Sequence, residues 1–145
     1  MDEVHLRDAE PRDAPVIADL CRQLGYPVPS AAVADHLREL SGRSAEHRLL
    51  VAMVGGAVVG WLEVSARQTL DAGRFAEISG LVVDERRRGA GVGKRLIDAA
   101  RSWAGERGVP RLRVRTNVVR ERTARFYERE GFRLAKQQRV YDLML

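Results

Sequence analysis

The sequence predicts an α/β fold in which a mixed, mostly antiparallel sheet is flanked by helices and contains one parallel strand pair. Three observations carry this prediction. Residues 75–83 are apolar on both faces at period two, as in a central strand. A charged turn and three alternating glycines follow, and then a long helix with apolar residues spaced by threes and fours. The element order around this unit, β-α-α-β-β-β-α-β-α-β-β, is that of a mixed α/β sandwich. The length of 145 residues indicates one domain over residues 1–145.

The first half of the chain is predicted to form a strand, two helices and a hairpin. The expected elements are a strand at 4–9, helices starting at the caps Asp13 and Ser30 and stopping at Gly25 and Gly42, and strands at 48–54 and 57–65. Gly55-Gly56 is a two-residue connection of the type that hairpins favour. Cys21 lies on the apolar face of the first helix, which indicates a structural thiol rather than a nucleophile.

The second half is built around the central strand at 75–83. The long helix after it ends at Gly108, and a strand at 111–116 is expected to lie parallel to the central strand. A short helix then carries Phe126 and Tyr127. Residues 137–145 alternate in polarity and are predicted to form a last antiparallel strand.

Composition limits the classes of protein that the chain can belong to. A single cysteine rules out an internal disulfide framework and favours a reducing compartment. The acidic N-terminus lacks the apolar run of a secretory signal, and the apolar run at 49–62 is too short to span a bilayer, so we expect a cytoplasmic protein. The net charge of +5 and pI near 10.1 admit nucleic-acid binding. The arginines are spread along the chain, however, and coenzyme A is a polyanion that the same charge would attract.

Residues 88–94, Arg-Gly-Ala-Gly-Val-Gly-Lys, are predicted to bind a phosphate group at the start of the long helix. The first N–H groups of a helix lack intrahelical partners and lie at the positive end of its dipole. Glycines at 89, 91 and 93 would let a pyrophosphate approach the backbone, while Arg88 and Lys94 add charge. Arg88 stands where a P-loop needs glycine, and Lys94 stands where the dinucleotide fingerprint needs one. Kinase and dehydrogenase chemistry are therefore not supported.

The pattern Arg-x-x-Gly-x-Gly at 88–93 resembles the pyrophosphate loop of the GNAT superfamily of N-acetyltransferases. A second match lies downstream, where 126–132 reads Phe-Tyr-Glu-Arg-Glu-Gly-Phe and is similar to that superfamily's Phe-Tyr-x-x-x-Gly-Phe signature. The resemblance covers residues 46–145. It implies a sheet whose parallel pair splays apart, acetyl-CoA as co-substrate, no metal, and direct acetyl transfer to a primary amine in a ternary complex.

The resemblance also implies roles for individual residues. The cofactor-binding positions would be Leu81, Val82, Val83, Arg88, Gly89, Ala90, Gly91, Val92, Gly93 and Lys94. Tyr127 would protonate the leaving thiolate, although Phe126 and Tyr127 could instead be an aromatic pair of the core. Glu77, expected on the strand face shared with Leu81 and Val83, would be the general base, or it could point into solvent. Glu63 is the alternative base.

The acceptor and the exact class of activity remain open from the sequence. The first expectation is a small-molecule amine, such as an aminoglycoside-like amine, an amino acid or a drug. The alternatives are a protein N-terminus or lysine, or a sensor that binds acyl-CoA without catalysis. Asn117 lies ten residues before Tyr127, where many superfamily members have an asparagine seven residues before it, and Arg120 holds that position. The expected partners are coenzyme A and the amine, without membrane or nucleic acid, and a homodimer is a candidate assembly.

Overall fold

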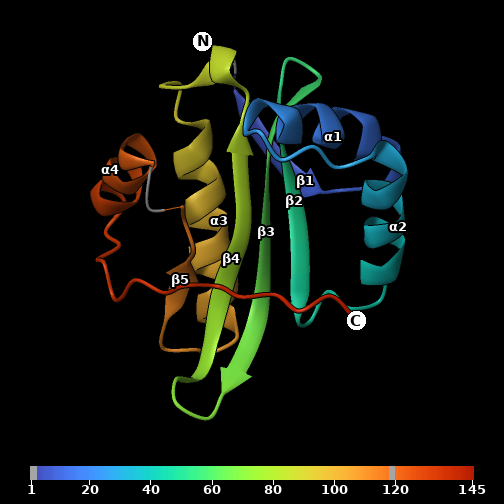
Figure 1. Ribbon diagram of the computed structural model, residues 1–145. Helices are drawn as coiled ribbons and strands as arrows, with labels where there is room; N and C mark the ends of the chain where they lie inside the picture. The colour runs from blue at the N-terminus through green and yellow to red at the C-terminus, as the bar shows by residue number, and fades with distance from the viewer. Residues whose placement is uncertain (1–2, 118–119) are drawn as a thin grey trace. The chain divides into compact units, whose positions relative to one another are not determined.

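A computed structural model describes residues 3–117 and 120–145 of the chain. Its contacts divide the chain into two compact units, Met1–Arg115 and Thr116–Leu145. The sheet and most of the helices belong to the first unit (Figure 1). In the described part of the chain, every helix is too short or too polar to cross a bilayer. The prediction of a single domain over residues 1–145 stays a prediction.

The first unit is organised on a five-stranded sheet in chain order (Figure 1). Its strands are β1 (Val4–Asp8), β2 (His47–Val54), β3 (Ala57–Thr69), β4 (Gly73–Val83) and β5 (Leu112–Val114). The first four strands pair antiparallel, and β5 pairs parallel to β4. The predicted fold class is therefore confirmed, including the parallel pair. Both faces of β4 are buried over residues 75–78, as expected for a strand between two helical layers.

Helices cover both faces of this sheet. They are α1 (Ala14–Gln23), α2 (Ser30–Leu40) and α3 (Val92–Glu106), with short 3-10 turns η1 (Pro11–Asp13) and η2 (Glu85–Arg87). Helices α1 and α2 share one buried cluster with Leu49 and Val51 of β2. Helix α3 packs on the opposite face, where Val92 and Leu96 lie beside Gly60.

Two β-bulges change which side chains share a face of the sheet. In the β2–β3 hairpin, Met53 lies opposite Val58 but Ala52 lies opposite Gly60, so that Val59 is an extra residue. In the β3–β4 pair, Glu63 lies opposite Gly80 and Val64 opposite Ile78, so Ser79 is extra. Each bulge shifts the alternation of side chains beyond it by one residue.

The second unit contains one helix among its described residues, α4 (Glu121–Arg129). The last strand predicted at 137–145 is wrong: these residues form neither helix nor strand, and Val140, Tyr141 and Leu143 are exposed. Alternating polarity supplies a face that could be buried, but a strand also needs a partner for its backbone N–H and C=O groups. Residues 120–145 provide no such strand.

The close packing of α3 against the sheet can be tested at Gly60. A Cβ at this position would lie 2.9 Å from the backbone oxygen of Val82, which cannot move without distorting β4. We expect Gly60→Ala to lower the free energy of unfolding by about 1–3 kcal/mol, as overpacking does. Gly105→Ala in α3 is the control, because a Cβ there meets no atom within 4 Å, and it should raise stability by about 0.5–1 kcal/mol. Urea unfolding measures both, and equal effects would contradict the packing.

Candidate active site

The glycine loop leads into the start of α3 as predicted. Gly91 is the N-cap residue of α3 and has a left-handed backbone, with φ of 83°, and Gly89 has φ of 84°. A Cβ built on either glycine would meet no protein atom within 4 Å, so the space beside the loop is open. The amide of Arg95 donates to the carbonyl of Gly91 at 3.1 Å, and the three amides before it lie at the positive end of the helix. This geometry suits a bound pyrophosphate.

Asp84 fixes the beginning of this loop at the end of β4. Its Oδ1 accepts from the backbone N–H of Arg86 at 3.0 Å, and its Oδ2 accepts from the Arg86 guanidinium at 3.0 Å. The hydrogen bonds from Arg86 lower the pKa of Asp84 to about 2, so the carboxylate is ionised at neutral pH. Gln23 of α1 accepts from the backbone N–H of Glu85 at 3.0 Å. The loop is thus tied both to the strand before it and to a helix of the other layer.

Strands β4 and β5 part at the place where the resemblance puts the thioester. In the described residues, their pairing covers only Ala76 to Ile78 of β4. The N–H of Asp84 donates to Val59 of β3, and Val82 lies opposite Trp61. Because backbone groups of an antiparallel strand point alternately to either side, the N–H groups of Leu81 and Val83 point away from β3. They face the side of β4 that β5 no longer covers.

Glu77 is buried and holds three segments together. Its Oε2 accepts from Arg67 of β3 at 2.9 Å, and its Oε1 accepts from Arg115, which follows β5, at 2.7 Å. The alternative that Glu77 points into solvent is wrong, since the residue is only 3% exposed. The expected face is also wrong: the Ser79 bulge shifts the alternation, so Glu77 lies opposite Ser65 on the face of Glu63 and not on that of Leu81.

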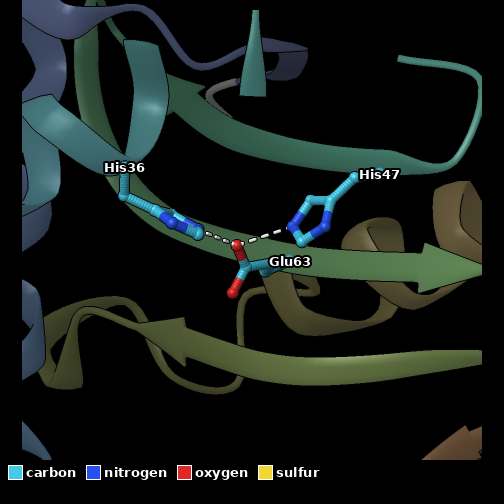
Figure 2. Close-up of side chains that lie close together, drawn as sticks. All are labelled: His36, His47 and Glu63. Carbon is cyan, nitrogen blue, oxygen red and sulfur yellow. Dashed lines mark hydrogen bonds and ion pairs between the residues drawn. The ribbon is translucent and has the colours of Figure 1, made fainter. Parts of the chain in front are cut away.

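Glu63 lies at the centre of a cluster that the sequence did not predict (Figure 2). His36 of α2 and His47 of β2 both contact its Oε2 through Nε2, with His47 at 2.8 Å. The Ser79 hydroxyl donates to Oε1 at 3.0 Å. Burial alone would raise the pKa of Glu63, but the hydrogen bonds to the two histidines outweigh burial and hold this pKa below its ordinary value. Gly80, opposite Glu63, precedes Leu81 directly, so the cluster lies beside the open stretch of β4.

Tyr127 belongs to the second unit, on α4. The residue is buried, and its ring lies edge-on to Phe126 and to Phe132, with centroids 5.2 Å and 5.6 Å away. The three aromatic residues of the signature therefore pack against one another within the second unit. Burial raises the pKa of the Tyr127 hydroxyl to about 12, so the hydroxyl carries its proton at neutral pH and can donate it.

Sequence reasoning missed several residues of the site. His36, His47 and Ser79 around Glu63, and Arg67 and Arg115 around Glu77, carry no motif. The hairpin at Gly55-Gly56 was a usable signal, because it predicts which residues of β2 and β3 face each other. This signal fails for His47, because the β-bulge between Ala52 and Met53 shifts the pairing. Without the bulge, His47 would lie opposite Val64 and not share a face with Glu63.

The comparison with protein families is consistent with this geometry. The model of the acetyltransferase (GNAT) family matches residues 14–132. Since the match covers most of the chain, the protein belongs to this family, whose co-substrate is acetyl-CoA and whose chemistry needs no metal. A search of curated protein sequences finds no match.

Solved structures with the same fold include acetyltransferases of several kinds. The aminoglycoside N-acetyltransferase AAC(6')-Iy in complex with CoA has 19% identity and a TM-score of 0.86, covering 100% of this chain and 97% of its own. Glucosamine-6-phosphate N-acetyltransferase from Arabidopsis thaliana has 19% identity and a TM-score of 0.81, with coverages of 98% and 99%. An acetyltransferase from Trypanosoma brucei has 26% identity and a TM-score of 0.79, with coverages of 97% and 100%.

The role of the glycine loop can be tested with two matched glycines of α3. Gly91 at its start and Gly108 beyond its end both have positive φ, 83° and 67°, and open space at Cβ. Alanine at either position should cost about 1–2 kcal/mol of stability through backbone strain. Only Gly91→Ala should also weaken acetyl-CoA binding, by about tenfold or more in Kd, because only Gly91 lies at the N-terminus of α3, where the pyrophosphate is expected. Isothermal titration calorimetry measures the affinity, and an equal loss in both variants would contradict the placement of the loop.

Proposed function

We propose that the protein is an N-acetyltransferase that moves the acetyl group of acetyl-CoA directly to a primary amine in a ternary complex. The observation that carries the proposal is the open stretch of β4 immediately before the glycine loop. Leu81 and Val83 direct their N–H groups to the side that β5 leaves uncovered. The residues from Arg88 to Lys94 would hold the pyrophosphate, and Leu81, Val82 and Val83 would hold the pantetheine and the thioester.

The proposed reaction forms one C–N bond and breaks one C–S bond. The amine nitrogen attacks the thioester carbonyl, and the N–H of Leu81 stabilises the oxyanion that develops on the carbonyl oxygen. When the C–S bond breaks, the hydroxyl of Tyr127 gives its proton to the thiolate. Its raised pKa keeps the donor protonated throughout the neutral range. The nitrogen gives one proton to solvent, Tyr127 regains a proton from solvent, and the acetylated amine and free coenzyme A leave.

Direct transfer is supported by the state of the sole cysteine. Cys21 is buried on α1, and burial raises the pKa of its thiol. A thiol that is protonated and covered by the core is a poor nucleophile, so an acyl-cysteine intermediate is disfavoured. Both substrates would then have to be bound together before transfer takes place.

The sequence offers two carboxylates that could face the acceptor amine, Glu77 and Glu63. The assignment of the general base to Glu77 stays a prediction, but both of its oxygens already accept from arginine. A carboxylate in two charge-assisted hydrogen bonds is better suited to hold strands than to receive an incoming amine. Glu63 also accepts hydrogen bonds, but from two imidazoles and the Ser79 hydroxyl rather than from arginine, and its side chain is 17% exposed against 4% for Glu77. We therefore propose that Glu63, one position before Leu81 by register, faces the acceptor amine and attracts its positive charge.

The proposed acceptor is a small-molecule amine. Two solved structures of the same fold are described as an aminoglycoside N-acetyltransferase and a glucosamine-6-phosphate N-acetyltransferase, and both acceptors are amino sugars. The half-buried, negatively charged carboxylate of Glu63 would attract such positively charged amines. A protein N-terminus or lysine is the alternative acceptor. Acyl-CoA sensing without transfer is the alternative without catalysis.

The deciding experiment measures coenzyme A release from acetyl-CoA with a panel of amino sugars, other small amines and peptides, for wild type and Tyr127→Phe. We expect turnover with at least one amine and initial-rate lines that intersect, as a ternary complex requires. Tyr127→Phe keeps the ring and removes the proton donor, so turnover should fall by about 10²- to 10⁴-fold. Acetyl-CoA affinity should be unchanged, since only a transition-state interaction is lost.

Tyr141→Phe is the matched control, because Tyr141 is exposed and its loss should leave turnover unchanged. Full turnover in Tyr127→Phe would assign Tyr127 to the aromatic core alone. Binding of acetyl-CoA without release of thiol for any amine would favour a sensor. Parallel initial-rate lines would exclude the ternary complex.

Glu63→Gln should mainly lower kcat/KM, whereas Glu77→Gln should mainly lower stability. Glu63→Gln removes the charge that attracts the amine, which is worth about 1.5–3 kcal/mol, so kcat/KM should fall about 10- to 100-fold. Glu77→Gln removes the charge that joins β3, β4 and the segment after β5, so it should lower the free energy of unfolding by about 1–3 kcal/mol. Its kcat/KM per folded molecule should change only a few-fold. Steady-state kinetics and urea unfolding measure both variants. If Glu77→Gln lost kcat/KM and Glu63→Gln lost stability instead, Glu77 would be the general base.

A further inference from the structure

We propose that His36, His47 and Glu63 form a binding site for one zinc ion, and that the bound ion inhibits acetyl transfer. The three side chains come from α2, β2 and β3, and each offers one ligand atom. These atoms all lie within 4.8 Å of one another. Figure 2 shows both imidazole rings pointing at the same carboxylate oxygen. Three groups from separate elements therefore converge on one point.

The chemistry of the three ligands favours zinc over magnesium and calcium. Two imidazoles and one carboxylate suit zinc, which binds nitrogen and oxygen ligands at about 2.0–2.2 Å in tetrahedral geometry. Magnesium and calcium instead prefer sites built from oxygen ligands alone. With three protein ligands, the fourth position of a tetrahedral zinc would remain open to water.

Glu63 already has the kind of hydrogen bond that orients a metal-binding carboxylate. The Oε1 atom, which does not contact the histidines, accepts from the Ser79 hydroxyl at 3.0 Å. A hydrogen bond of this kind orients a ligating carboxylate and leaves its other oxygen for the metal. Ser79 is the extra residue of the β4 bulge, so the bulge itself supplies this contact. The carboxylate is therefore fixed on one side and directed at the histidines on the other.

A zinc ion also needs room and a path of entry. His47 Nε2 lies 2.8 Å from Glu63 Oε2, whereas two ligands of a tetrahedral zinc lie roughly 3.3 Å apart, so the cluster must open slightly. The side chain of His36 is 44% exposed and can rotate outward, and that of His47 is 23% exposed. The ion can thus reach the cluster from solvent without unfolding either element.

The inhibitory part of the proposal rests on the proposed function. Glu63 lies opposite Gly80, directly before Leu81, and is the carboxylate assigned to the acceptor amine. An ion bound to that carboxylate neutralises its charge and occupies the place of the amine. Zinc should therefore compete with the amine and leave acetyl-CoA binding at the glycine loop intact.

The test uses the full chain freed of metal with a chelator and then titrated with zinc sulfate. Wild type should bind one zinc per chain, measured by calorimetry and by competition with a chromophoric chelator. Its melting temperature should rise with zinc, because the ion binds the folded state only. Cobalt(II) in place of zinc should give the visible absorption of a tetrahedral site. These three readouts do not depend on acetyl transfer.

The chain provides a matched control, since its third histidine, His5, lies on β1 away from the cluster. His36→Ala and His47→Ala should each weaken zinc binding by more than about 100-fold, and Ser79→Ala by about 10-fold, while His5→Ala should leave it unchanged. Failure of wild type to bind zinc or to gain stability would overturn the site, as would equal loss in His5→Ala. One zinc bound at the cluster without loss of acetyl transfer would overturn the inhibition alone.

Discussion

The ion pair of Glu77 with Arg67 and Arg115 is the contact on which the rest of the active site depends. It lies on β4 just before the point where β5 stops pairing, and it joins β3, β4 and the segment after β5. A parallel pair as short as three residues has few backbone hydrogen bonds to keep it in register. The buried carboxylate supplies charge-assisted hydrogen bonds in their place. The strands can therefore separate beyond Ile78 without loss of the pair behind it.

The separated stretch of β4 and the glycine loop are the two parts of the proposed cofactor site. Beyond Ile78, β4 directs backbone N–H groups to its uncovered side, and a few residues later α3 begins with a positive helix end. Both features use backbone amides, which carry no net charge and need no side chain. Asp84, between them, holds the turn through Arg86. In the proposed function, acetyl-CoA would therefore meet two groups of backbone donors, one on β4 and one at the start of α3.

The sequence was sufficient for the parts of the structure that depend on local pattern. The alternation at 75–83, the glycines before α3 and the hairpin at Gly55-Gly56 each predicted the element that forms. The strand at 137–145 failed because alternation says nothing about a pairing partner. The surroundings of Glu63 and Glu77 could not be predicted, because both depend on contacts across the sheet. His36 lies 27 residues from Glu63, and Arg115 lies 38 residues from Glu77.

The bulge at Ser79 divides β4 into two segments that can change independently. Before it, β4 carries core residues and the Glu77 ion pair; after it, β4 has the opposite alternation and carries the N–H groups proposed to face acetyl-CoA. A substitution in one segment therefore need not alter which way the other segment faces. The extra residue therefore sets the orientation of the Glu77 ion pair apart from that of the stretch proposed to bind acetyl-CoA.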